Sequence, residues 1–130
     1  MKKVAWSVDD DKNLREALCM MLNLMGYATR AFLSAWDAAA ALMVGDRPDI
    51  LFLDINMPEV SGIEFLKIVR GRPNWNDIPV LIVSSESAEI QVEVVIRLGA
   101  DGYVFKPVNF EELQLAVDSA ISRRKITSGG

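Results

Sequence analysis

The sequence contains no histidine and a single cysteine, Cys19. Without histidine, the chain has no histidine-based catalysis, no zinc site of the usual kind and no phosphohistidine of its own. One cysteine cannot form an internal disulfide, which favours a reducing compartment. Lys and Arg number 14 against 18 Asp and Glu, so the formal charge is −4 and the pI is near 4.8. The chain therefore lacks the basic footprint of a protein that binds nucleic acid or an anionic membrane.

Long apolar runs are also missing. No stretch approaches the ~20 residues of a membrane helix, and the first apolar run stops at acidic residues too early for a signal peptide. We therefore expect a cytoplasmic chain without membrane contact. The length of 130 residues and the hydrophobic content of 51% suit one domain with a sizeable core. We expect this domain to span residues 1–126, with 127–130 as a flexible tail or the start of a linker.

Short apolar runs alternate with segments of helical periodicity along the chain. Strands are expected near residues 4–8, 27–33, 50–53, 80–83 and 103–105. Helices are expected between them and after the last, near residues 12–25, 34–44, 61–71, 87–98 and 109–125. The unbroken apolarity of residues 50–53 and 80–83 is typical of strands covered on both faces. Five strands alternating with five helices predict an α/β fold, a doubly wound parallel sheet with helices on both faces.

Polar side chains stand at the carboxyl ends of the predicted strands. They follow the first, third, fourth and fifth strands in turn: Asp9 and Asp10, Asp54, Ser84, and Lys106. In open α/β sheets the ligand crevice lies outside those strand ends. We therefore expect three carboxylates, a hydroxyl and an ammonium group to meet there.

Three carboxylates within a few ångströms repel one another unless a cation is present. Oxygen ligands without nitrogen or sulfur suit Mg²⁺ or Mn²⁺. A carboxylate can also attack a phosphoryl group, and the transfer then needs mainly positioning and charge neutralisation. For any single acid, a helix cap is the simpler interpretation, and Asp11 is consistent with that role alone. Four strand ends with the right residue types favour a phosphoryl-transfer site.

These residues resemble the receiver domain of two-component response regulators, and most closely its stand-alone chemotaxis type. The resemblance covers the chain from Lys3 to about Arg123. It rests on these segments: Val8-Asp9-Asp10, Leu53-Asp54-Ile55-Asn56-Met57-Pro58 with Gly62, Val83-Ser84-Ser85, Gly99-Ala100-Asp101-Gly102-Tyr103 and Lys106-Pro107. It implies a flavodoxin-like fold with strand order 2-1-3-4-5, an order that the family shares with known doubly wound proteins.

The resemblance also implies roles for these residues. Asp54 would accept the phosphoryl group, and Mg²⁺ would bind Asp10, Asp54 and the backbone carbonyl of Asn56, with Asp9 acting through water. Lys106 would contact the phosphoryl oxygens, and the Lys106–Pro107 peptide would be cis. The switch residues would be Ser84, which would bond the phosphoryl group, and Tyr103, which would change rotamer.

Two further positions would tune hydrolysis of the phosphorylated state. Asn56 and Glu86 occupy the places that flank the line of attack on phosphorus in the family, and the pair resembles the fast chemotaxis pattern. In this interpretation the chain is a signalling switch that catalyses its own phosphoryl transfer and dephosphorylation, and it has no external substrate. Its phosphodonor would be a sensor histidine kinase, a phosphotransfer protein or a small phosphodonor.

The fourth helix, the fifth strand and the fifth helix form the family's output surface, toward a partner or a second copy. If Ile90, Val94 and Leu98 form the buried stripe of the fourth helix, Val92 and Ile96 fall outside it. These two would then form an exposed apolar strip within that surface. A helix buried on most sides is the alternative.

Other functions fit the sequence less well. A phosphate-independent interaction module with the same fold is the main alternative, but it would not need the complete set of acceptor, metal ligands and lysine. A phosphatase with an aspartyl intermediate would place a second carboxylate two residues after Asp54, where Asn56 stands. A dinucleotide-binding domain would carry G-x-G-x-x-G after the first strand, and this sequence does not.

Overall fold

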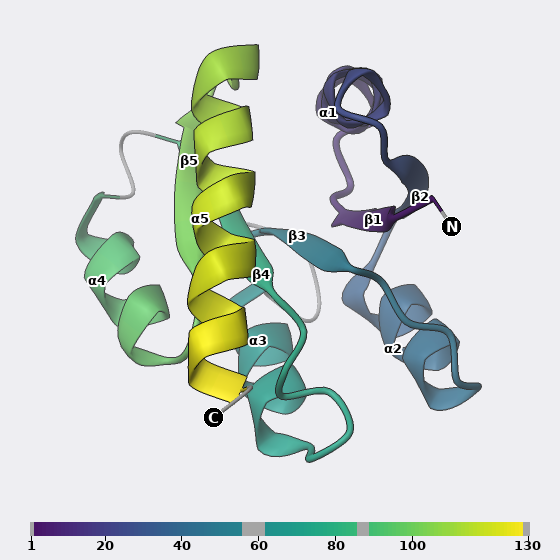
Figure 1. The fold of residues 1–130 in the computed structure, drawn as a ribbon, viewed down its shortest axis with the longest axis vertical. Helices are drawn as coiled ribbons and strands as arrows, with labels where there is room; N and C mark the ends of the chain where they lie inside the picture. Colours follow the sequence, from purple (N-terminus) through teal and green to yellow (C-terminus); the bar gives the residue numbers. More distant parts are fainter. Residues whose placement is uncertain (1, 56–61, 86–88, 129–130) are drawn as a thin grey trace.

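The structure is a computed structural model, and it describes residues 2–55, 62–85 and 89–128 (Figure 1). Strands and helices alternate in the described part of the chain. The strands are β1 Val4–Val8, β2 Ala28–Phe32, β3 Ile50–Asp54, β4 Val80–Ser85 and β5 Gly102–Lys106. The helices are α1 Lys12–Leu24, α2 Ala35–Met43, α3 Gly62–Gly71, α4 Glu89–Arg97 and α5 Phe110–Ser128. No helix among these residues is long and apolar enough to cross a membrane.

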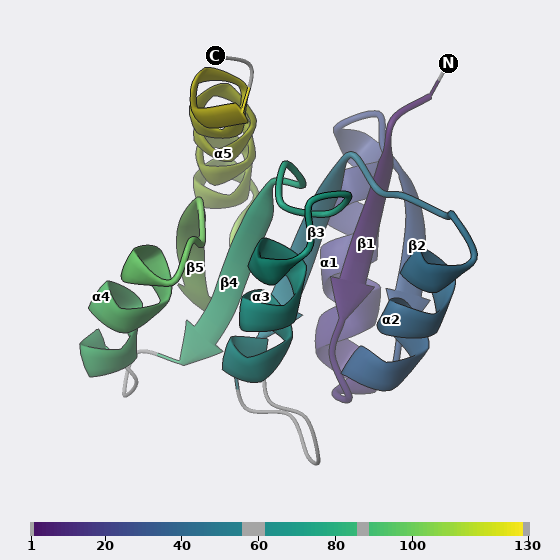
Figure 2. The same cartoon turned by 90° about the horizontal axis from the view of Figure 1, so that it is seen from below.

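The five strands form one parallel sheet in the order β2-β1-β3-β4-β5, which confirms the predicted flavodoxin-like topology. Figure 2 shows the strand arrows pointing the same way, with α2, α3 and α4 on one face of the sheet. The other face is covered by α1 and α5, which contribute Leu18, Leu22, Leu113 and Val117 to a second buried cluster. Because β3 lies at the centre, all five of its residues are buried.

Local sequence signals define several helix ends. Asp11 precedes α1 and its carboxylate accepts the backbone N–H groups of Asn13 and Leu14. Ser34 and Asn109 cap α2 and α5 in the same manner, as the sequence predicts. The helix α5 continues through Ser128, so its last two residues belong to the stretch that the sequence assigned to a tail. Neither glycine nor proline interrupts it before Gly129.

The predicted buried face of α4 is wrong. Val95 is fully buried against the core, while Val94 is 44% exposed. Ile96 and Leu98 pack partly buried against the same core cluster, so the predicted exposed strip of Val92 and Ile96 does not form. The face is rotated by about one residue because Val94, Val95 and Ile96 are all apolar, and periodicity alone cannot choose between neighbours of equal hydrophobicity.

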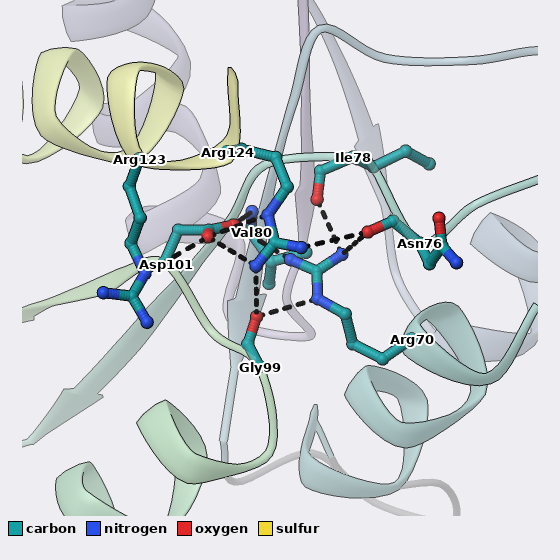
Figure 3. Close-up of polar contacts among 8 residues, drawn as sticks. All are labelled: Arg70, Asn76, Ile78, Val80, Gly99, Asp101, Arg123 and Arg124. Carbon is teal, nitrogen blue, oxygen red and sulfur yellow. Dashed lines mark hydrogen bonds and ion pairs between the residues drawn. The ribbon is translucent and has the colours of Figure 1, made fainter. Parts of the chain in front are cut away.

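A buried ion network lies at the end of the sheet away from the carboxyl ends of the strands (Figure 3). Asp101 lies before β5, and its carboxylate accepts hydrogen bonds from Arg70 of α3, Arg124 of α5 and the backbone of Val80. The donor–acceptor distance is 2.9 Å in each case. The side chain of Asp101 is completely buried and that of Arg124 is 10% exposed.

The same two guanidinium groups also hold backbone carbonyls. Arg70 donates to the carbonyl of Gly99 at 2.8 Å and to that of Ile78 at 2.8 Å, and Arg124 donates to the carbonyl of Asn76 at 3.1 Å. Gly99 has φ of +112°, and a Cβ there would meet the Arg70 side chain. Burial and the charge of Arg124 lower the pKa of Arg70 to about 10, so Arg70 stays charged at neutral pH. The network thus ties the end of α5 to α3 and to the loop before β5.

We predict that Asp101→Asn lowers the free energy of unfolding by about 3 kcal/mol, because it leaves two buried guanidinium groups without their counter-charge. The matched control is Asp46→Asn, which breaks the exposed pair of Asp46 with Arg30 and should cost less than about 1 kcal/mol. Urea unfolding followed by circular dichroism measures both changes. Equal effects of the two substitutions would contradict the stabilising role of the network.

Candidate functional site

Three carboxylates meet at the carboxyl edge of the sheet, as the strand-end pattern predicts. Asp9 follows β1 and Asp10 comes next to it, while Asp54 is the last residue of β3. Ligand oxygens of all three residues lie within 4.8 Å of one another. β1 and β3 are neighbours in the sheet, with Val8 beside Leu53, so the parallel register alone brings these acids together.

Asp9 is held in place by its neighbours in α1. Its carboxylate accepts the backbone N–H of Asp11 at 2.8 Å, and its backbone carbonyl accepts a hydrogen bond from Arg15 at 3.0 Å. Asp11 in turn caps α1. Burial leaves 3% of Asp9 exposed, whereas Asp10 beside it is exposed to solvent.

Asp54 is almost completely buried and lies beside the lysine at the end of β5. The ammonium group of Lys106 approaches a carboxylate oxygen of Asp54 at 3.3 Å, and the lysine side chain is 28% exposed. The start of α3 packs closely on this strand end, because a Cβ on Gly62 would overlap the backbone carbonyl oxygen of Asp54. A residue larger than glycine at position 62 would therefore displace the carboxylate at the centre of the site.

Two further residues named by the sequence lie on β4 and β5. Ser84 is fully buried, and its hydroxyl oxygen has no hydrogen-bond partner among the described residues. Such a buried hydroxyl group is costly unless another group completes it. Tyr103 is 41% exposed, with its ring 5.1 Å from that of Phe105. The hydroxyl of Ser84 is thus free to bond a ligand, and the phenol of Tyr103 has access to solvent.

Burial at the acidic edge of the sheet changes the acidity of Asp9. Burial is the largest cause and raises the pKa of Asp9 to about 6, with a further rise from the charge of Asp54. The hydrogen bond from the Asp11 amide and the charge of Lys106 oppose this rise. The protonated form of Asp9 is thus favoured mainly because burial disfavours its charge, and a bound cation would favour the charged form instead.

The donor set is suited to a hard divalent cation. Asp9, Asp10 and Asp54 offer carboxylate oxygens, and the chain has no histidine to add a nitrogen ligand. Mg²⁺ takes one or two protein carboxylates, keeps several waters and often binds together with a phosphoryl oxygen. The acidic triad is therefore able to hold a metal ion. Because Asp10 is exposed, water molecules bound to that ion would have access from solvent.

Comparison with known proteins agrees with this geometry. Residues 6–118 match the family model of the response regulator receiver domain. The chain belongs to the response regulator receiver family. A receiver domain is a signalling module rather than a classical enzyme.

The relatives include both longer and stand-alone proteins. The chain is 34% identical to the response regulator MprA of Mycobacterium tuberculosis over 120 residues, which are 91% of this chain and 50% of that protein. It thus spans about half the length of the curated relatives that it matches. The solved structure of Vibrio cholerae chemotaxis protein CheY4 superposes with a TM-score of 0.82 at 27% identity, covering 92% of this chain and 99% of that one. NtrX of Brucella abortus gives 0.86 at 26% identity, covering 98% of this chain and 28% of that one.

The structure brings together the four charged site residues that it describes. Asp9, Asp10 and Asp54 form the triad, Lys106 reaches Asp54, and the Lys106–Pro107 peptide is cis as the resemblance implies. Asn56 and Glu86 lie outside the described residues, so their tuning roles stay predictions.

Sequence reasoning did not identify Arg15 as a residue that positions the site. Arg15 lies in the first turn of α1, six residues after Asp9, and its bond to a backbone carbonyl gives no residue-type signal in the sequence.

We predict that the metal-free receiver loses stability as the pH rises from about 4 to about 6. The folded chain binds the Asp9 proton more tightly than the unfolded chain, so this contribution is fully present below the unfolded pKa of about 4 and is lost through the folded pKa of about 6. Asp9→Asn should remove the loss and raise the free energy of unfolding at pH 7 by about 3 kcal/mol.

The measurement is urea unfolding in EDTA at pH 4.5 and pH 7 for the wild type and the variant. Glu93→Gln, an exposed substitution on α4, serves as the control for general carboxylate titration. A pH dependence of Asp9→Asn equal to that of the wild type would contradict the raised pKa.

Proposed function

We propose that this receiver accepts a phosphoryl group on Asp54 from a histidine kinase, a phosphotransfer protein or a small phosphodonor. The observation that carries the proposal is the pairing of buried Asp54 with Lys106 beside two further acids. An Asp54 carboxylate oxygen forms the new bond to phosphorus as the bond from phosphorus to the donor breaks, and the donor leaves with its electron pair. Water later attacks the phosphorus, which returns the Asp54 carboxylate and releases phosphate. One cycle therefore consumes the phosphodonor and a water molecule, and the chain acts on no further substrate.

The bound metal would be Mg²⁺, held by Asp10 and Asp54 with the backbone carbonyl of Asn56, and by Asp9 through water. Mg²⁺ would supply neutralisation of the charge that gathers on the phosphoryl oxygens. The chain's own residues do the rest. Asp9 and Asp10 supply carboxylates beside Asp54 for the metal and its waters. The ammonium group of Lys106 is available to a phosphoryl oxygen, and the close packing of Gly62 fixes the backbone of Asp54.

The buried hydroxyl of Ser84 supports a switch linked to phosphorylation. It has no partner among the described residues, so a phosphoryl group on Asp54 gives it a hydrogen bond in one state only. A contact made in one state alone is what shifts a population. Movement of Ser84 toward the phosphoryl group frees space beneath β5, and Tyr103 turns inward from its exposed position. The surface of α4, β5 and α5 then presents a different face to an output partner or to a second copy.

Asn56 and Glu86 complete the proposal as the residues that tune hydrolysis. A short amide two residues after the acceptor leaves room for an attacking water and can bond it, whereas a bulky apolar side chain would exclude it. Glu86, two residues after Ser84, would orient that water. This pair favours a short-lived phosphorylated state.

We predict that Asp54→Asn abolishes phosphorylation while the fold is kept, because the amide has similar volume but is a poor nucleophile. The measurement is acid-labile phosphorylation after incubation with acetyl phosphate and Mg²⁺, resolved on a phosphate-affinity gel. Asp46→Asn, exposed and away from the site, should be labelled like the wild type. Normal labelling of Asp54→Asn would refute the acceptor assignment. Unchanged wild-type labelling in EDTA would refute the metal requirement.

We predict that Lys106→Arg still accepts the phosphoryl group but switches poorly. The guanidinium group keeps the positive charge, yet its planar fork cannot replace the compact ammonium that must bond carboxylate in one state and phosphoryl oxygen in the other. The readout is the change in Tyr103 environment on adding beryllofluoride and Mg²⁺, followed by NMR of ring-labelled tyrosine. A wild-type spectral change in Lys106→Arg would contradict this role, and Lys67→Arg on α3 is the control.

A further inference from the structure

The helix α2 is apolar on both of its sides. Of its nine residues, Asp37 is the one polar side chain. The inner side packs Ala35, Ala38, Ala41 and Leu42 into the core. The outer side is exposed and forms what we call the α2 stripe: Trp36, Ala40, Met43 and the C-cap residue Val44. A helix that is apolar all round is normally buried on all sides.

The α2 stripe is compact rather than scattered. At 100° per residue its four members fall within an arc of about 100° on the helix surface. Trp36 is 59% exposed, Met43 64% and Val44 79%, and Leu33 just before the helix is 58% exposed. A contiguous apolar patch of this kind on a protein surface marks an interaction site.

A hollow of about 240 Å³ lies at the C-terminal end of the stripe. It is lined by residues of α2 and of the segment after α3: Leu42, Met43, Arg72, Pro73, Asn74 and Trp75. Arg72 stacks on the Trp75 ring at 4.7 Å, so the wall of the hollow is aromatic and carries positive charge. A protruding tryptophan thus stands at one end of α2 and a hollow at the other.

We propose that a second copy of this chain covers the α2 stripe, with the two α2 helices antiparallel about a two-fold axis at Ala40. An antiparallel pair brings the first turn of each helix to the last turn of the other. Trp36 of each copy then enters the hollow of the other, so the contact is made twice. Ala40 is small and lies between Trp36 and Val44, which lets the helices approach closely at the axis. A two-fold interface requires such a self-complementary patch.

The charged residues near the two ends of α2 are also complementary in the antiparallel arrangement. Asp37 stands next to Trp36, and Arg72 lines the hollow with Arg47 nearby, at the wall of the adjoining hollow. Asp46 also lines the adjoining hollow, and it pairs with Arg30 of its own chain. The antiparallel arrangement therefore brings Asp37 of one copy toward Arg72 of the other. Arg47 already pairs with Asp77 of its own chain, which leaves Arg72 as the principal partner of Asp37. An unrelated partner would need to reproduce this distribution of charge, whereas a second copy has it already.

The surface area buried between the two copies indicates how tightly they would bind. Burial of Leu33, Trp36, Met43 and Val44 from both copies removes roughly 1,000 Å² from water, at the lower limit for a specific interface. We therefore expect a dimer with a dissociation constant in the micromolar range or weaker. This association uses the face of α2 and is independent of α4, β5 and α5, so it needs no phosphorylation.

The test is sedimentation velocity of the 130-residue chain, without phosphodonor, over concentrations up to about 1 mM. The wild type should dimerise reversibly, and Trp36→Glu or Met43→Lys should raise the dissociation constant at least tenfold. Both side chains are exposed, so thermal unfolding should stay near that of the wild type. Met20→Glu, on α1 and 66% exposed, is the matched control and should change the constant less than twofold. A monomer at all concentrations, or a dimer indifferent to both stripe variants, overturns the proposal.

Cross-linking tests the axis directly. In a Cys19→Ser background, Ala40→Cys faces itself across the two-fold and should oxidise to a covalent dimer, and Met20→Cys should not. Adding Trp36→Glu to Ala40→Cys should suppress the cross-link. If Ala40→Cys dimerises with the dissociation constant of the wild type but does not cross-link, the antiparallel arrangement is wrong. Readouts of Asp54 phosphorylation are unaffected by this outcome, so the two proposals fail separately.

Discussion

Burial of carboxylates at one edge of the sheet is the constraint on which the site depends. The parallel sheet brings Asp9, Asp10 and Asp54 to this edge, and Lys106 places a positive charge beside Asp54. The pKa of Asp9 is raised mainly because burial disfavours its charged form, and the charge of Asp54 adds to the rise. Closely spaced buried carboxylates normally destabilise a folded protein. The cluster is useful where a bound cation and a phosphoryl group complete its interactions. The strain is therefore located where the chemistry takes place.

Buried charge is balanced at one end of the sheet and incompletely balanced at the other. At the amino-terminal edge, Asp101 receives hydrogen bonds from two arginines and a backbone amide, and the arginines also satisfy several carbonyl groups. At the carboxyl edge, the acids outnumber the bases and the hydroxyl of Ser84 has no partner among the described residues. The first arrangement holds α3, β5 and α5 together in one geometry. The second leaves bonds to be formed, so that a ligand can change the balance between two states.

Features that depend on local pattern were predictable from the sequence, and features that depend on distant side chains were not. The meeting of Asp9, Asp54 and Lys106 follows from parallel strands whose carboxyl ends share an edge. The strand order was available only through the resemblance to the receiver family, because alternating strands and helices do not by themselves fix which strands are neighbours. The face of α4 was predicted wrongly because consecutive valine and isoleucine residues erase the helical period. The Asp101 network joins residues 31 and 23 positions away from it, and no spacing rule connects them. The role of Arg15 could not be predicted, because it binds the backbone carbonyl of Asp9 and any residue type carries such a carbonyl.

The helices differ in how they can serve a switch. α5 is anchored through Arg124 to Asp101 and to the carbonyl of Asn76, so its last turns are tied to the loop after α3. α4 packs on the sheet through apolar side chains, with Val95 fully buried and Ile96 and Leu98 partly buried against the same core cluster. Apolar contacts have no preferred direction, whereas the guanidinium hydrogen bonds of Arg124 fix one geometry. In the proposed switch, α4 can therefore shift more readily than α5, whose end is held by the Arg124 anchor.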